Sequence, residues 1–169
     1  MEIIKTYTQS VPAFRFIGRV YHEDDRVDGS FAAHWGKAFE TGLFADLEKI
    51  AVPFYEDADA YVGLMRHKEG EPFLYAIGML TAADTPVPDG YEAIDFPASE
   101  FGVCWLYGKE PELYGKEALV MQKLAEQGLS LWLDHEGACW AMERYTCPRF
   151  TTPDEQGNII IDLAFLVTE

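Results

Sequence analysis

The sequence predicts an α+β fold, in which two βαββ repeats related by a pseudo-twofold axis form an antiparallel sheet with two main helices. Three observations predict it: a β-hairpin pattern in each half, a helical segment before each hairpin, and a motif that recurs 85 residues further on. The chain has 169 residues, of which 49% are hydrophobic and 14% aromatic, so it can bury the core of one domain. We therefore expect a single domain, residues 1–169, with repeats spanning about residues 1–84 and 91–169.

The first half opens with two strand-like segments, residues 3–7 and 12–21, in which β-branched and aromatic residues dominate. An acidic loop, residues 22–30, follows them. Two further apolar runs, residues 61–67 and 73–81, flank the turn sequence KEGEP. Short apolar runs on either side of a Gly-containing turn predict a β-hairpin.

The helix of the first half is predicted by an apolar stripe. Four bulky apolar residues recur at every fourth position: Phe31, Trp35, Phe39 and Leu43. This spacing places them on one face of a helix. Gly42 disfavours helix and marks the end of the first segment, so we expect a second short helix over residues 43–50.

The second half repeats this order after a linker-like segment, DTPVPDG, at residues 84–90. Strand-like residues 91–96 precede the segment PASEFGVCWLYG, which resembles the earlier PAFRFIGRVY because both begin Pro-Ala and place a Phe four residues after the proline. Residues 112–127 predict a helix that Gly128 ends, and residues 129–133 are expected to extend it or to dock against the core.

The last predicted hairpin joins residues 138–150 to residues 159–168. Alternate residues of a strand share a face, so Ala141, Glu143 and Tyr145 should point the same way. The repeat alignment pairs Leu64 of the first half with Glu143 of the second.

A carboxylate in an apolar strand needs an explanation, because a buried charge is costly unless it is paired or hydrogen-bonded. Two explanations are open for Glu143. It is either bonded to a neighbouring Tyr, Trp or Arg inside the core, or it faces a cavity that receives a ligand.

Charge and composition exclude several classes of function. The formal net charge is −16, which disfavours nucleic acid and anionic membranes as partners and is compatible with cationic small ligands or with solubility alone. Neither a signal peptide nor an apolar run of membrane-spanning length is present in the sequence. We expect a cytoplasmic protein.

Cofactor and metal sites are not expected. The three cysteines form no CxxC pair, and the four histidines are scattered through the chain. Cys104, Cys139 and Cys147 suit a reducing compartment as free, inert core thiols.

Several segments together resemble the GyrI-like effector-binding domains. FAAHWGKAFETG resembles the helix of that family with its Trp, YVGLMRHKEGEPFLYAIGML its first hairpin, and DFPASEFGVCWLYG its Pro-Ala strand. AMERYTC resembles the Phe-Glu-x-Tyr signature, with Met142 in place of the Phe and with Glu143 and Tyr145 retained. The family includes the drug-binding halves of multidrug and AraC-type bacterial transcription regulators and integron-cassette effector-binding proteins.

The resemblance implies a pocket between the two halves that takes flat, hydrophobic and often cationic molecules, with Glu143 as its acid. A dry pocket strengthens both ion pairing and cation–π contacts. We predict six ligand-binding residues: Glu143, Tyr145, Trp35, Phe39, Tyr75 and Trp105. The strand predicted from Pro12 onward leaves no room for a preceding DNA-binding motif, so we expect a stand-alone sensor or sequestering protein that does not bind DNA directly.

Two other functions stay open. The resemblance also implies a hydrolase that opens cyclopropane-type toxins, in which Glu143 and Tyr145 would be the catalytic residues. An acidic surface that binds a protein partner, as the gyrase-inhibiting relatives suggest, is the third hypothesis.

Overall fold

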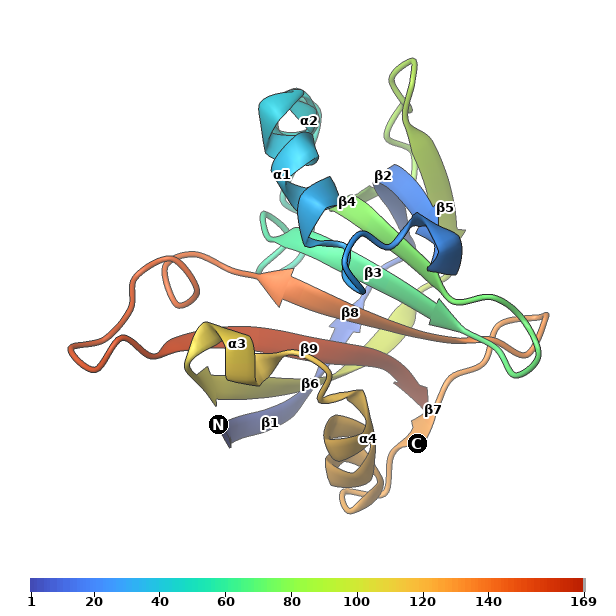
Figure 1. The fold of residues 1–169 in the computed structure, drawn as a ribbon. Helices are drawn as coiled ribbons and strands as arrows, with labels where there is room; N and C mark the ends of the chain where they lie inside the picture. Colours follow the sequence, from blue (N-terminus) through green and yellow to red (C-terminus); the bar gives the residue numbers. More distant parts are fainter. Residues whose placement is uncertain (169) are drawn as a thin grey trace.

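A computed structural model describes residues 1–168 as one antiparallel sheet flanked by short helices (Figure 1). Its nine strands are β1 (Glu2–Val11), β2 (Phe14–His22), β3 (Tyr61–His67), β4 (Leu74–Ala82), β5 (Glu92–Phe96), β6 (Ser99–Gly108), β7 (Ser130–Leu131), β8 (Cys139–Tyr145) and β9 (Ile159–Thr168). Its helices are the 3₁₀ helix η1 (Glu23–Asp25) and α1 (Ala32–Glu40), α2 (Leu43–Glu48), α3 (Glu110–Leu113) and α4 (Glu117–Ala125). The predicted α+β class with two main helices, α1 and α4, is confirmed.

The strands lie in the order β1-β6-β9-β8-β3-β4-β2-β5, and β7 pairs with β9. The two halves meet at the central β3–β8 pair, from which β9 and β6 follow on one side and β4 and β2 on the other. The first strand of each half pairs with the second strand of the other half: β1 pairs with β6, and β5 pairs with β2. Two copies of one motif would give this order, and the pseudo-twofold relation itself stays a prediction.

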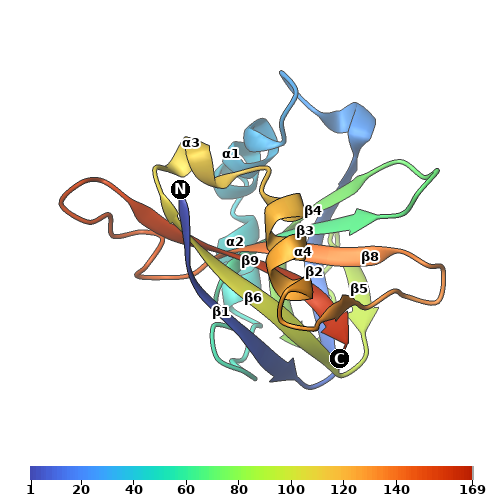
Figure 2. The ribbon, with the colours of Figure 1, turned by 90° about the horizontal axis from the view of Figure 1, so that it is seen from below.

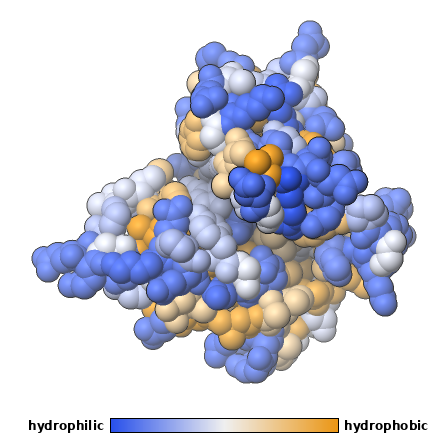
Figure 3. All heavy atoms as spheres, viewed as in Figure 1, coloured by the Kyte–Doolittle hydropathy of each residue, from blue (hydrophilic) through white to orange (hydrophobic). Residues whose placement is uncertain are grey.

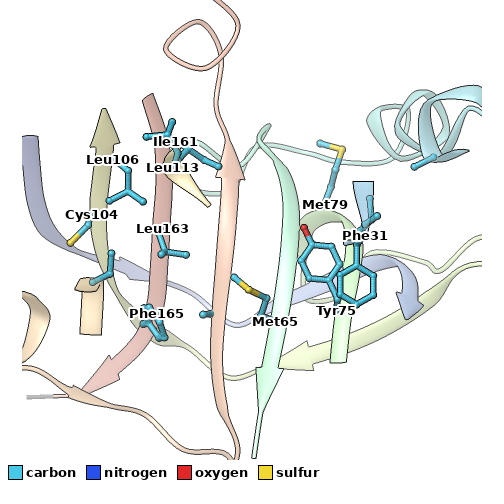
Figure 4. Packing of buried hydrophobic residues seen from close by; sticks show 14 of the residues in the cluster. Phe31, Met65, Tyr75, Met79, Cys104, Leu106, Leu113, Ile161, Leu163 and Phe165 are labelled. Carbon is cyan, nitrogen blue, oxygen red and sulfur yellow. The ribbon is translucent and has the colours of Figure 1, made fainter. Parts of the chain in front are cut away.

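The α-helices form two groups along the sheet. In the first half, α1 and α2 pack against β4, whereas α3 contacts β6 and α4 contacts β9 in the second half (Figures 1 and 2). The core beneath them contains Leu43 and Phe44 from α2, Val120 and Leu124 from α4, and inward residues of the strands. Figure 4 shows part of this core, with Met65 and Met79 in one region and Leu106 and Leu163 in the other.

A second core lies on the opposite face of the sheet. Phe14 of β2 and Phe101 of β6 meet there edge to face at 5.5 Å between ring centroids, although several strands separate β2 from β6 in the sheet. The sheet must therefore bend strongly so that its far face closes on itself, and among the described residues no helix contributes a buried side chain to this second core. Phe96 of β5 and Trp140 of β8 make a similar contact at 5.0 Å.

The central strand pair fixes which residues share a face with Glu143. Glu143 of β8 lies opposite Gly63 of β3, and Leu64 lies opposite Met142. Leu64 and Met142 belong to the core on the far face of the sheet, whereas Glu143 faces the helices. The alignment that paired Leu64 with Glu143 is therefore wrong, because equivalent residues of two repeats must share a face.

Other boundaries differ from the prediction for local reasons. The single helix expected over residues 112–127 is two helices, because Gly115 adopts a φ of 68° between α3 and α4. Residues 130–131 are not helical but form β7. Strand β8 ends at Tyr145 rather than at residue 150, and β1 is longer than the predicted residues 3–7.

Candidate functional site

A cavity of about 1340 Å³ lies over the central strands, between the α1–α2 and the α3–α4 side of the molecule. The surface is hollowed in this region in Figure 3. Aromatic side chains from both halves form much of the wall: Phe31, Trp35, Tyr61, Phe73, Tyr114 and Phe150. The volume exceeds the range of roughly 300–1,000 Å³ usual for small-molecule sites.

Glu143 lies in the floor of this cavity with only 8% of its surface exposed. Its Oε2 atom accepts hydrogen bonds from the hydroxyls of Tyr75 at 2.9 Å and of Tyr145 at 3.0 Å. Burial raises the pKa of the Glu143 carboxyl to about 7, although the two hydroxyls lower it, and the negative charge of Glu117 raises it further. A carboxyl with this pKa changes its charge near neutral pH.

Tyr75 links Glu143 to helix α1. Its hydroxyl oxygen accepts a hydrogen bond from Nε1 of Trp35 at 3.0 Å while it donates to Glu143. Its ring stacks on Phe31, with centroids 4.5 Å apart and planes 4° apart, as the adjacent rings in Figure 4 show. Burial is the main cause that raises the pKa of Tyr75, so its hydroxyl stays a proton donor at neutral pH.

Tyr145 is the second hydroxyl donor to Oε2 of Glu143. The edge-to-face contacts of its ring are with Trp35 and with Phe150, each at 4.8 Å between centroids. Burial and the nearby charge of Glu143 raise the pKa of Tyr145 well above its usual value. Glu143 is therefore held by two neutral phenols that are themselves fixed by aromatic packing.

Four more acids line the cavity: Glu48, Asp59, Glu110 and Glu117. Glu48 accepts a hydrogen bond from the Tyr61 hydroxyl at 2.6 Å, and burial together with this bond raises the pKa of Tyr61 to about 12. Glu110 accepts one from the Tyr114 hydroxyl at 3.0 Å. Within residues 1–168, none of the five cavity acids forms an ion pair.

Five of the six predicted site residues line this cavity. Glu143, Tyr145, Trp35 and Tyr75 form the connected group described above, and Phe39 lies at the rim with 57% of its surface exposed. A role for these residues in binding a ligand stays a prediction.

Trp105 lies outside the cavity, on the opposite face of the sheet. Its ring contacts two cations: Lys5 Nζ lies 4.2 Å from the ring centroid and the Arg149 guanidinium lies 4.6 Å from it. On β6 it is Cys104 and Leu106 that belong to the core beneath the helices. Placing Trp105 in the pocket was wrong because the apolar pattern of β6, buried on both faces, does not reveal which row faces the helices.

Sequence reasoning missed several residues of the wall. Phe31 belongs to the same helical stripe as Trp35 and Phe39, and that spacing is a signal that could have found it. Tyr114 lies in the break between α3 and α4, and Phe150 follows the end of β8. Both positions depend on the course of loops that the sequence pattern does not specify.

The three cysteines differ in their surroundings. Cys104 is buried, whereas Cys139 and Cys147 lie in the cavity wall, and all three are free. Across residues 1–168, no three His, Cys, Asp or Glu side chains gather as a metal site would require. The helices in that part of the chain are too short or too polar to cross a membrane.

Comparison with known proteins identifies the fold through solved structures. No protein-family model matches the sequence, and no curated protein matches it. SAV2435 bound to tetraphenylphosphonium matches with a TM-score of 0.68 and 16% identity, over 98% of this chain and 94% of that one. This chain has the same fold. The fold expected from the resemblance to GyrI-like effector-binding domains is thereby confirmed.

Two further structures share this fold. The C-terminal domain of EcmrR matches with a TM-score of 0.60 and 10% identity, over 98% of both chains. A hydrolase encoded by lin2189 from Listeria innocua matches with a TM-score of 0.52 and 12% identity, over 97% of this chain and 92% of that one. Proteins of more than one kind of function thus use this architecture.

Proposed function

We propose that this protein binds hydrophobic, cationic aromatic small molecules in the cavity and serves as a sensor or a sequestering protein for them. One observation carries the proposal: the buried Glu143 carboxylate lies at the floor of a large aromatic cavity with no basic side chain paired to it among residues 1–168. A carboxylate in such surroundings gains much from an added cation, because low local polarity strengthens ion pairing.

The charge of the whole lining supports a cationic ligand. Five carboxylates line the cavity, and its two basic side chains are Arg26 and His67. Arg26 is already paired with Glu23 at 2.7 Å, so its charge is largely compensated. A cation entering the cavity therefore meets a net negative lining and aromatic faces that favour cation–π contact.

The comparison with SAV2435 supports the same class of ligand. That protein shares the fold and has been solved bound to tetraphenylphosphonium, a cation with four phenyl groups. The aromatic wall and Glu143 of this chain offer complementary surface and charge for such a molecule. Stacking contacts tolerate variation in shape, so we expect several aromatic cations to bind.

Calorimetric titration with tetraphenylphosphonium at pH 8 tests the proposal. We expect saturable binding to the wild type and an affinity at least tenfold lower for Glu143→Gln, about 1.4 kcal/mol of binding free energy. Glu69→Gln is the matched control, because it removes one negative charge at an exposed turn outside the cavity. Its affinity should equal that of the wild type within twofold.

Tetraphenylborate provides the control for charge, since it has nearly the same shape and the opposite sign. We expect it to bind the wild type at least a hundredfold more weakly than tetraphenylphosphonium. Equal affinities for the two ions, or equal affinities of Glu143→Gln and wild type for the cation, would contradict the proposal.

Hydrolysis of a reactive xenobiotic is the second candidate function. The pKa of Glu143 near 7 favours it, because a general base works best near the pH of the reaction. The shared fold of the Listeria innocua hydrolase is consistent with it. Incubation with a cyclopropane-bearing alkylating agent should give a ring-opened product that Glu143→Gln fails to form, and the absence of product from the wild type would exclude this reaction.

A further inference from the structure

Gly63 lies in the middle of β3, directly opposite Glu143. Its neighbours along the strand on the same face, Tyr61 and Met65, point into the cavity. A Cβ atom at residue 63 would lie 2.3 Å from the hydroxyl oxygen of Tyr75 and 3.1 Å from Oε2 of Glu143. The space that a side chain would fill is thus occupied by the Tyr75–Glu143 hydrogen bond.

The backbone of Gly63 gives no other reason for a glycine. Its φ lies outside the left-handed region, where glycine is favoured, and it belongs to a regular strand. Glycine in a strand interior is unfavourable because it lacks a side chain to pack and loses more backbone freedom on folding. Available space, rather than backbone conformation, therefore accounts for a glycine at this position.

The other extended glycines that meet close neighbours differ from Gly63. Added Cβ atoms at Gly18 and Gly78 would meet backbone atoms of the facing strand, at 2.1 and 2.0 Å. An added Cβ at Gly102 would meet the Leu124 side chain at 2.9 Å in the core. Gly63 differs from these three because its close neighbours belong to the polar group of the cavity.

Tyr75 cannot simply move away from an added methyl group. Tyr75 has only 6% of its surface exposed, its ring stacks on Phe31 with centroids 4.5 Å apart, and its hydroxyl accepts a hydrogen bond from Trp35. A shift large enough to relieve a 2.3 Å contact would lengthen or break the hydrogen bonds to both Trp35 and Glu143.

We propose that Gly63 is a positioning residue for the cavity acid: its missing side chain lets the Tyr75 hydroxyl reach Glu143 and so sets the charge state and orientation of the carboxylate. The part of this inference that concerns a ligand rests on the proposed function. The part that concerns the Tyr75–Glu143 bond does not, so the two can fail separately.

A double-mutant cycle of Gly63→Ala and Tyr75→Phe tests the proposal, because the second substitution removes the oxygen that the new methyl group would meet. Its main readout is the pKa of Glu143, followed by ¹³C NMR of the labelled carboxyl group. We expect Gly63→Ala and Tyr75→Phe each to raise that pKa, since the Tyr75 hydroxyl lowers it. The double variant should match Tyr75→Phe alone.

Stability provides a second readout of the cycle. Gly63→Ala should lower the urea midpoint in the wild-type background and lower it much less, or raise it, in the Tyr75→Phe background. Gly36→Ala is the control, because an added methyl group at that helical position meets no atom within 4 Å. This variant should leave the pKa of Glu143 unchanged and should not lower the urea midpoint.

Ligand affinity completes the test. We expect Gly63→Ala to weaken tetraphenylphosphonium binding about fivefold and the double variant to bind like Tyr75→Phe. An unchanged Glu143 pKa in Gly63→Ala, or a double variant as unstable as Gly63→Ala, would overturn the inference. A wild type that fails to bind the cation would refute the proposed function, and the pKa cycle would still decide the role of Gly63.

Discussion

Two buried carboxylates on neighbouring strands, Glu143 of β8 and Asp162 of β9, are stabilised in opposite ways. Asp162 is fully buried on the far face of the sheet and accepts hydrogen bonds from Arg144 at 2.8 Å and from Arg149 at 2.6 and 2.9 Å. Glu143 faces the cavity, is 8% exposed, and accepts hydrogen bonds from the hydroxyls of Tyr75 and Tyr145.

The difference separates a structural acid from a candidate binding acid. The protein supplies the counter-charge of Asp162 itself, so this carboxylate can stay ionised inside the fold. For Glu143 the described residues supply phenols and a second acid, Glu117, so its ionised form is stabilised by hydrogen bonds alone. A bound cation would supply a counter-charge to Glu143, as Arg144 and Arg149 supply one to Asp162.

Removal of the structural acid should have the largest effect on stability. Asp162→Asn leaves the fully buried Arg144 without its closest carboxylate, and we expect it to lower the free energy of unfolding by about 3–5 kcal/mol. Glu143→Gln should not lower it at pH 7, because the neutral amide leaves no buried charge unpaired and avoids the cost of ionising a buried carboxyl. Urea denaturation of both variants measures the difference. Similar losses of stability would contradict the distinction between the two acids.

The dependence of stability on pH should identify the binding acid. Because the folded pKa of Glu143 is about 7, above its ordinary value of 4.5, the folded state retains this proton better than the unfolded state does. The resulting stabilisation is complete below pH 4.5 and is lost as the pH rises through 7. Relative to Glu143→Gln, the wild type should lose up to about 3 kcal/mol over that interval. Parallel pH profiles of the two proteins would contradict a raised pKa.

Ligand affinity should show the opposite pH dependence. Tetraphenylphosphonium should prefer the ionised carboxylate, so its affinity should rise about tenfold between pH 6 and pH 8. The titratable groups that face Glu143 from its own and the surrounding elements are Tyr75, Tyr145, Tyr114 and Glu117. Calorimetry across this interval should give a much flatter profile for Glu143→Gln, and the same slope in both proteins would contradict the assignment of the pH dependence to Glu143.

The smallest expected effect is a change in ligand affinity, tested by comparing two tryptophans on opposite faces of the sheet. Trp35→Phe removes the hydrogen bond to Tyr75 and should weaken tetraphenylphosphonium binding about fivefold, since one such bond contributes about 1 kcal/mol. Trp105→Phe should leave the affinity unchanged within twofold, because Trp105 lies outside the cavity. A comparable loss in Trp105→Phe would show that the two faces are coupled.

Much of the site could be predicted from local periodicity. The alternation of side chains along β8 places Glu143 and Tyr145 on one face, and the helical spacing of Trp35 and Phe39 gives one stripe. The single acid in a largely apolar strand drew attention to Glu143. These inferences hold because each depends only on residues within one element.

The features of the fold and site that the sequence did not predict depend on contacts between elements that are distant in sequence. The placement of Trp105 failed because β6 is apolar on both faces, so its pattern fits either orientation. The Asp162 network includes a hydrogen bond from Arg144 to Gln9, which is 135 residues away in sequence. The contact between Gly63 and the Tyr75 hydroxyl likewise requires the register of β3, β4 and β8.

The most direct test of the account measures whether a bound cation replaces the proton of Glu143. Calorimetric titration of tetraphenylphosphonium at pH 7, in two buffers of different ionisation enthalpy, gives the number of protons released per ligand bound. We predict about half a proton for the wild type, because a carboxyl with a pKa near 7 is half protonated before binding, and none for Glu143→Gln. Binding without proton release, or equal release from both proteins, would contradict the assignment of Glu143 as the acid that a cationic ligand neutralises.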